Sequence, residues 1–182
     1  PEKRVIIGRE YGYHGSTVLS ASMGGMVGMH QQAADAPGFA HVKPPYGFLY
    51  QGNLSEADFA TTAASWLEDK ITEIGADKVA AFVAEPIQGA GGVIIPPTGY
   101  LNKVEAICQA HDILFIVDEV MTGLGRTGRM WACQHEEVSP DILCTAKGLT
   151  GGYLPLAATL TTEKIYEAFL GDYTQLKTFF HG

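Results

Sequence analysis

The chain has 182 residues, enough for one domain with a sizeable core, and its 46% hydrophobic and 18% charged residues are ordinary for a globular protein. The formal net charge of −8 argues against a general binder of nucleic-acid phosphates, because such proteins need a basic face. No apolar run is long enough to cross a bilayer, and no signal-peptide pattern is present. We therefore expect neither nucleic acid nor membrane as a partner.

The cysteines bear on the redox compartment of the protein, and the histidines bear on whether it has a metal site. Cys108, Cys133 and Cys144 are odd in number and form no CxxC pair, and Cys108 and Cys144 lie in apolar periodic stretches typical of core thiols. This usage favours a reducing compartment, and we expect a cytoplasmic location. The six histidines show no HxH or HExxH spacing, so no metal site is expected.

In chain order, the apolar run at residues 5–7 predicts a strand, and a helix is expected to begin near Ser16. Residues 24–53 are rich in Gly, Pro, His and aromatic residues without a clean period. We predict one long, irregular loop there, and in a compact domain such loops are usually functional.

A long amphipathic helix is predicted next. Ser55 opens it, Asp58 three residues on resembles a capping box, and Gly75 is the expected end. Further elements follow from their apolar patterns: strands at residues 79–84, 113–117 and 142–146, an apolar run at 156–160, and helices around residues 100–108 and 162–170.

These strands are apolar on both faces and alternate with amphipathic helices, which predicts an α/β fold with a mostly parallel sheet covered by helices on both faces. In open parallel sheets, ligands bind outside the carboxyl ends of the strands. Three of the predicted strands end on ionisable residues, Glu85, Asp118 and Lys147. Charges placed together at this edge cost desolvation energy, so a ligand or mutual pairing should compensate for it.

Asp118 and Lys147 suggest a particular chemistry. A carboxylate beside a pyridine nitrogen favours the protonated ring, which then acts as an electron sink. A partly desolvated lysine amine can form a Schiff base and can carry a proton between substrate carbons. A structural salt bridge between the two residues is the alternative.

Five motifs share the order and spacing of one protein family. They are Tyr-His-Gly at 13–15, Ala-Glu-Pro-Ile-Gln-Gly at 84–89, Asp-Glu-Val at 118–120, Thr-Gly-Leu-Gly-Arg-Thr-Gly at 122–128 and Ala-Lys-Gly at 146–148. With them the chain resembles the class III, or ω-amino, aminotransferases, which use pyridoxal 5'-phosphate (PLP). The resemblance implies that residues 1–182 form a single domain, the large PLP-binding domain of the type I PLP-dependent transferase fold.

The resemblance also implies roles for individual residues. Lys147 forms the Schiff base with PLP and is the catalytic residue, and Asp118 pairs with the pyridinium nitrogen. Val120 packs against one face of the ring, and the Tyr13 ring stacks on the other.

Three further residues belong to the expected site. By the resemblance, His14 positions the loop beside Tyr13, and Glu85 lies near the cofactor behind the residues that contact it. Tyr13 and Gly182 are expected to contact the substrate. The family moves an amino group from a small-molecule amine donor to an oxo-acid acceptor, and it implies a homodimer with the active site at the interface.

The ends of the chain suggest an incomplete piece of a longer protein. It begins at Pro1 without an initiator methionine and stops at Gly182, straight after a loop-like aromatic stretch. In the family, a loop that holds the cofactor phosphate lies upstream of this region, and a threonine and an arginine that hold phosphate and substrate lie downstream. Without those donors we expect weak binding of PLP and an inactive piece. A non-catalytic structural piece is therefore an alternative interpretation.

Two branches of the family compete. Residues 1–104 resemble diamine or ω-amino acid:pyruvate aminotransferases, and residues 105–182 resemble the diaminopelargonate aminotransferases of biotin synthesis. Ala90 and Met121 stand where ornithine- and GABA-type members carry Glu and Gln, and Ser16 stands where biotin-pathway members usually carry Asp. We expect a diamine or ω-amino acid donor, with the diaminopelargonate enzyme as the alternative.

A remote alternative is an NAD-dependent oxidoreductase. Residues 123–128 match GxGxxG after a strand, and Asp141 lies roughly where a ribose-binding acid is expected. However, residues 118–122 separate the strand from the glycines, and residues 130–137 lack the apolar period of a phosphate-capping helix.

Overall fold

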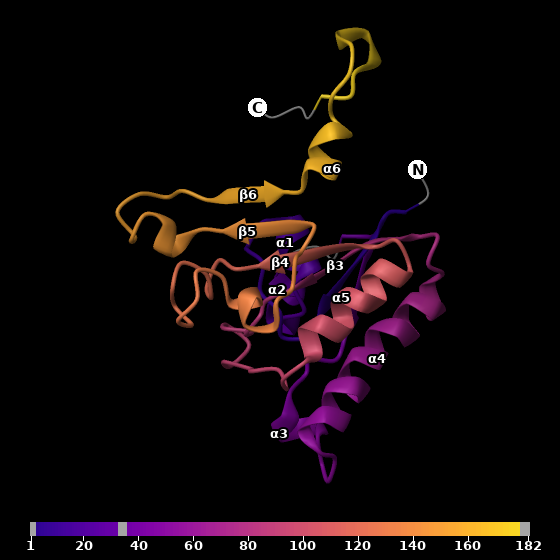
Figure 1. Ribbon diagram of the computed structural model, residues 1–182, viewed down its shortest axis with the longest axis vertical. Helices are drawn as coiled ribbons and strands as arrows, with labels where there is room; N and C mark the ends of the chain where they lie inside the picture. The colour runs from indigo at the N-terminus through magenta and orange to yellow at the C-terminus, as the bar shows by residue number, and fades with distance from the viewer. Residues whose placement is uncertain (1–2, 33–35, 179–182) are drawn as a thin grey trace.

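The computed structural model describes residues 3–32 and 36–178, and its centre is a six-stranded sheet in the order β2-β1-β3-β4-β5-β6 (Figure 1). Its strands are β1 (Val5–Arg9), β2 (Phe39–Val42), β3 (Val79–Ala84), β4 (Leu114–Asp118), β5 (Ile142–Thr145) and β6 (Ala158–Thr161). All neighbouring pairs are parallel except β5 and β6, which are antiparallel. The predicted mostly parallel α/β sheet is confirmed.

Helices connect the strands. They are α1 (Val18–Met23), α2 (Val27–Gln32), α3 (Gly47–Tyr50), α4 (Glu56–Ile74), α5 (Tyr100–Ala110) and α6 (Glu163–Glu167), with 3₁₀ turns η1 (Ala132–Glu136), η2 (Lys147–Leu149) and η3 (Tyr173–Gln175). The helices α4 and α5 lie side by side, whereas α6 projects away from the sheet (Figure 1). Within the part of the chain that the structure describes, no helix is both long and apolar enough to cross a membrane.

Helices cover both faces of the sheet, as predicted, and strand β1 shows why. Successive residues of a strand point to opposite faces. Ile7 is fully buried in the core shared with α4 and α5. A Cβ atom on the next residue, Gly8, would come within 2.3 Å of the Met23 carbonyl oxygen at the end of α1. Glycine is therefore needed at residue 8 for α1 to lie this close to the opposite face.

The prediction of one irregular loop over residues 24–53 is wrong. This stretch contains α2, β2 and α3, and β2 pairs in parallel with β1, with Gly8 opposite His41. The four residues of β2 show no alternation of buried and exposed side chains, since three of them are half-buried. Pairing with β1, rather than a local hydrophobic pattern, makes this segment a strand.

Helix α4 begins and ends where the sequence predicts. The Ser55 hydroxyl oxygen accepts a hydrogen bond from the Asp58 backbone N–H at 3.1 Å, and Gly75 at the other end has φ of 95°. The cap satisfies one of the backbone donors that a helix leaves free at its first turn.

Substituting Ser55→Ala is expected to lower the free energy of unfolding by about 1 kcal/mol, because one N-terminal amide of α4 loses its acceptor. Urea denaturation of the two proteins measures the difference. Ser65→Ala is the matched control, since the Ser65 hydroxyl donates to the Thr62 carbonyl on the exposed side of the same helix. Equal stabilities of the Ser55 variant and the parent would contradict the assigned cap.

Cys108 and Cys133 are buried and Cys144 is half-buried, so the predicted core location is confirmed for Cys108 and holds only in part for Cys144. Burial raises the pKa of the Cys108 thiol to about 12, and burial together with the nearby Glu119 carboxylate raises that of Cys133 to about 12. All three cysteines are free. At neutral pH the thiols of Cys108 and Cys133 are therefore protonated and chemically inert.

Candidate active site

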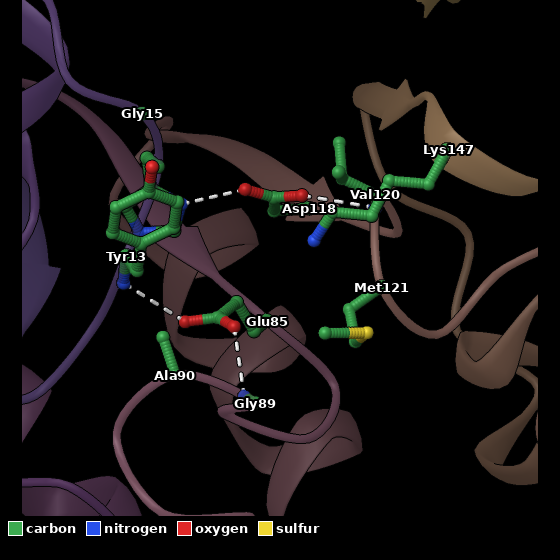
Figure 2. A pocket seen from close by; sticks show the side chains of 10 residues that line it. Tyr13, Gly15, Glu85, Gly89, Ala90, Asp118, Val120, Met121 and Lys147 are labelled. Atoms are coloured by element: carbon green, nitrogen blue, oxygen red, sulfur yellow. Dashed lines mark hydrogen bonds and ion pairs between the residues drawn. The ribbon is translucent and has the colours of Figure 1, made fainter. Parts of the chain in front are cut away.

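The carboxyl ends of β3, β4 and β5 meet at one edge of the sheet, and a cavity of about 290 Å³ opens there (Figure 2). Glu85 follows β3, Asp118 ends β4 and Lys147 follows β5, so the three ionisable residues predicted to share this edge do so. The cavity volume is just below the range that is usual for small-molecule pockets, about 300–1,000 Å³. Its lining is completed by Tyr13, His14, Gly15, Gly89, Ala90, Val120 and Met121.

Asp118 is held by two donors. The ring nitrogen Nδ1 of His14 lies 2.7 Å from Oδ2 of Asp118, and the backbone N–H of Val120 donates to Oδ1 at 3.0 Å. An ionised carboxylate only accepts hydrogen bonds, so beside a charged Asp118 it is the His14 ring that donates, from Nδ1. The carboxylate is nearly buried and has one orientation. The sequence placed His14 in the loop beside Tyr13 but did not reveal this contact across 104 positions of the chain.

Glu85 joins two loops of the cavity. Its side-chain oxygens accept hydrogen bonds from the backbone N–H groups of Tyr13 and Gly89, each at 3.0 Å (Figure 2). The buried Arg9 guanidinium donates to the Glu85 carbonyl. Hydrogen bonds thus hold both the side chain and the backbone carbonyl of Glu85, and the side chain links the loop after β1 to the loop after β3.

Tyr13 and Val120 lie on opposite sides of the cavity, with Asp118 between them (Figure 2). Lys147 extends into the same space from the end of β5, toward the side where Asp118 and Val120 lie. Among the ion pairs of the described residues, none joins Asp118 to Lys147. The arrangement therefore does not support the alternative of a structural salt bridge between them.

The backbone of Lys147 is in the left-handed region, with φ of 45°. Such a conformation costs a residue with a Cβ atom about 1–2 kcal/mol, and strain of this kind gathers at functional sites. Lys147 follows Ala146 directly after β5, so the chain turns sharply as it leaves this strand.

This strain predicts an inverted order of stability between two variants. The free energy of unfolding of Lys147→Gly is expected to be about 1 kcal/mol higher than that of Lys147→Ala, because glycine adopts positive φ without a Cβ penalty. At ordinary positions glycine is the less stable of the two. Thermal or urea unfolding measures the difference. If Lys147→Ala were more stable than Lys147→Gly, the backbone at residue 147 would not be strained.

Some lining residues were not predicted as site residues. Gly15 and Gly89 are the last residues of two predicted motifs, Ala90 and Met121 lie next to motifs, and the structure shows a reason for glycine at residue 89. A Cβ atom on Gly89 would come within 3.2 Å of Met121 Cγ, so glycine at residue 89 makes room for this side chain at the cavity wall. Gly182, predicted to contact substrate, lies outside the described residues.

The GxGxxG match at residues 123–128 does not form a dinucleotide site. The segment is a series of turns, and the 3₁₀ turn η1 follows it instead of an α-helix whose N-terminus could hold a pyrophosphate. Gly123 has a packing role, because a Cβ atom there would come within 2.8 Å of the Trp131 ring. The geometry does not support the oxidoreductase alternative.

Comparison with known proteins also indicates an aminotransferase. Residues 1–181 match the family model described as aminotransferase class-III. The putrescine–pyruvate aminotransferase of Pseudomonas aeruginosa is 46% identical over 183 residues, which cover 100% of this chain and 39% of that protein. The adenosylmethionine-8-amino-7-oxononanoate aminotransferase of Anoxybacillus flavithermus is 48% identical over 172 residues, 94% of this chain and 38% of that protein. The chain thus spans less than two fifths of the length of these two curated relatives.

Among solved structures, an amine transaminase from an uncultivated Pseudomonas species in its PLP-bound form superimposes with a TM-score of 0.89 and 37% identity. The match covers 93% of this chain and 38% of that one. The predicted fold, that of type I PLP-dependent transferases, is confirmed, and these comparisons lend no support to an oxidoreductase. From the family match and the shared fold, the chain belongs to the class-III aminotransferases.

Proposed function

We propose that the protein containing this chain is a PLP-dependent aminotransferase that moves an amino group from an amine or ω-amino donor to an oxo acceptor. The observation that carries the proposal is the shared cavity of Asp118 and Lys147, with Tyr13 and Val120 on its opposite sides. We also propose that residues 1–182 are the PLP-binding large domain.

The residues present fit PLP in shape and in chemistry. A flat ring needs walls on two sides, and the Tyr13 ring and the Val120 side chain supply them. A ring nitrogen that carries a proton needs a buried acceptor, and Asp118 is one whose orientation His14 and Val120 fix. An aldehyde needs an amine within the same cavity, and Lys147 is the only lysine among its lining residues.

When bound, PLP supplies the electrophilic carbon that takes up the amino group and the ring that withdraws electrons. Lys147 would hold that carbon, and its amine would move a proton at the substrate carbon. Asp118 would hold the proton on the ring nitrogen. His14 keeps the Asp118 carboxylate turned toward the cavity, and Glu85 keeps Tyr13 in place.

The donor class is proposed from two lining residues of the cavity. Ala90 and Met121 stand where ornithine- and GABA-type members carry Glu and Gln, and they add no charged or amide side chain to a lining that includes Glu85. We therefore propose a diamine or ω-amino acid donor and an oxo-acid acceptor such as pyruvate, in keeping with the relative named for putrescine and pyruvate. A diaminopelargonate aminotransferase is the second candidate, favoured by the 48% identity to the relative named for that reaction.

We further propose a homodimer in the cytoplasm. The segment after Lys147 exposes large apolar side chains, with Tyr153, Leu154 and Leu156 at 91%, 71% and 56% exposure. Apolar groups gathered in this way mark a contact surface, and they lie beside the residue that would hold the cofactor. The free thiols favour a reducing compartment.

Donor screening tests the proposal. The full-length protein is incubated with PLP and with putrescine, β-alanine or S-adenosylmethionine, and the oxo-acid acceptor is pyruvate or, for S-adenosylmethionine, 8-amino-7-oxononanoate. Amino transfer from putrescine or β-alanine is the expected result. Transfer from S-adenosylmethionine alone would support the second candidate, and no transfer from any donor in a protein that binds PLP would refute both.

A further inference from the structure

Glu119 lies between two residues of the cavity, Asp118 and Val120, yet its own side chain is turned into the protein and is 1% exposed. Its carboxylate accepts hydrogen bonds from the Thr122 hydroxyl at 2.5 Å and from the Cys133 backbone N–H at 2.8 Å. A buried carboxylate is costly unless its oxygens are satisfied, and here both oxygens have a donor. Glu119 thereby fastens both ends of the segment 122–133 to the end of β4.

The fastened segment is a tight set of turns. The backbone N–H of Gly123 donates to the Glu119 carbonyl at 2.9 Å, and that of Leu124 donates to the Met130 carbonyl at 2.6 Å. Leu124 has φ of 56°, a conformation that a leucine keeps only when its surroundings enforce it. These contacts fix where the Leu124 side chain points.

Leu124 packs against the residue that follows Lys147. A Cβ atom on Gly148 would lie 3.3 Å from Leu124 Cδ1 and 3.4 Å from Leu124 Cβ, so the leucine side chain lies directly against the Gly148 backbone. Lys147 and Gly148 belong to the same 3₁₀ turn, whose first residue has positive φ. The leucine thus supports this strained turn from the side.

We propose that Glu119 is a positioning residue for Lys147, and that it acts through the segment 122–133 and the contact of Leu124 with Gly148. The inference rests on the proposed role of Lys147 and gives the glycine-rich motif at 123–128 a function in this chain. Loss of the Glu119 anchor would let Leu124 withdraw, and the turn at Lys147 would then lose its lateral support. A shift of about 1 Å in a reacting group can lower a rate about a hundredfold.

Four variants of the full-length protein test this coupling. Glu119→Ala removes the anchor, and Leu124→Ala removes the contact. Glu119→Gln keeps it, because its amide oxygen can accept from Cys133 and its NH₂ can donate to Thr122. Glu137→Gln is the control, an exposed acid that follows η1.

The first readout is amide hydrogen exchange in the PLP-free protein. Residues 149–151 donate to the carbonyls of residues 146–148, so their amides report on this turn. Exchange there should become about tenfold faster in Glu119→Ala and in Leu124→Ala and stay unchanged in the other two variants. Unchanged exchange in a folded Glu119→Ala protein would overturn the proposal, and if that variant does not fold, Leu124→Ala decides in the same way.

The second readout is steady-state kinetics with PLP bound. We expect kcat to fall about tenfold to a hundredfold in the two alanine variants while KM for the amine stays within about threefold, since the reacting group rather than the binding surface moves. A rise in KM with unchanged kcat would contradict the coupling. Because exchange is measured without cofactor or substrate, it separates failure of this inference from failure of the proposed aminotransferase activity.

Discussion

Lys147→Ala in the full-length protein should abolish the PLP adduct that borohydride traps and lower kcat for amino transfer at least about 10³-fold. Lys147 is the lysine that lines the cavity with Asp118, and its amine is the group that would hold the cofactor carbon. Proton transfer by a positioned side chain alone contributes about 10²–10⁴-fold, and the substitution removes covalent attachment as well. The measurement is mass spectrometry of the reduced protein, with peptide mapping of the label, beside the kinetics.

The matched control is Lys164→Ala, since Lys164 is an exposed lysine on α6. It should give the same trapped adduct and the same kcat as the parent protein. A reduced adduct in the Lys147 variant, mapped to another lysine with most of the activity kept, would show that the central assignment is wrong.

Asp118→Asn should lower kcat about 10²–10³-fold, the loss seen when one preorganised electrostatic partner is removed from an active site. Asparagine has nearly the same shape but no charge, so it holds the ring-nitrogen proton poorly. The substitution also disturbs the contacts of Asp118. Its two carboxylate oxygens accept hydrogen bonds from His14 and from Val120, whereas the asparagine side chain has only one oxygen acceptor and an NH₂ donor.

The kinetic comparison needs an absorbance spectrum of the PLP-bound variant beside it, because ring protonation changes the cofactor's colour. Asp69→Asn, on the exposed side of α4, is the control and should leave both measurements unchanged. If kcat of the Asp118 variant stayed within about threefold of the parent, Asp118 would not be the ring-nitrogen partner.

Much of the fold was predictable because its strongest signals are local. The strand predicted at residues 79–84 has the same bounds as β3, and α4 begins after Ser55 and ends before Gly75 as its caps indicate. Apolar runs and cap residues decide these elements within a few residues of the chain, so a sequence displays them directly.

The parts of the structure that the sequence did not predict lack such a local signal. The edge strand β2 carries no period of its own and becomes a strand through its ladder with β1. The GxGxxG match, a remote alternative from the start, describes glycine spacing alone, and the structure places the 3₁₀ turn η1 rather than an α-helix directly after it.

By itself, the sequence determined which ionisable residues share an edge. Strands with two apolar faces make a parallel sheet, parallel strands bring their carboxyl ends together, and Glu85, Asp118 and Lys147 follow those ends. Only the tertiary structure decided how these residues are held: His14 against Asp118, Glu85 on the Tyr13 amide, and Leu124 beside Gly148. Each of these contacts joins segments distant in the chain, and their meeting depends on side-chain directions and loop packing that no local pattern encodes.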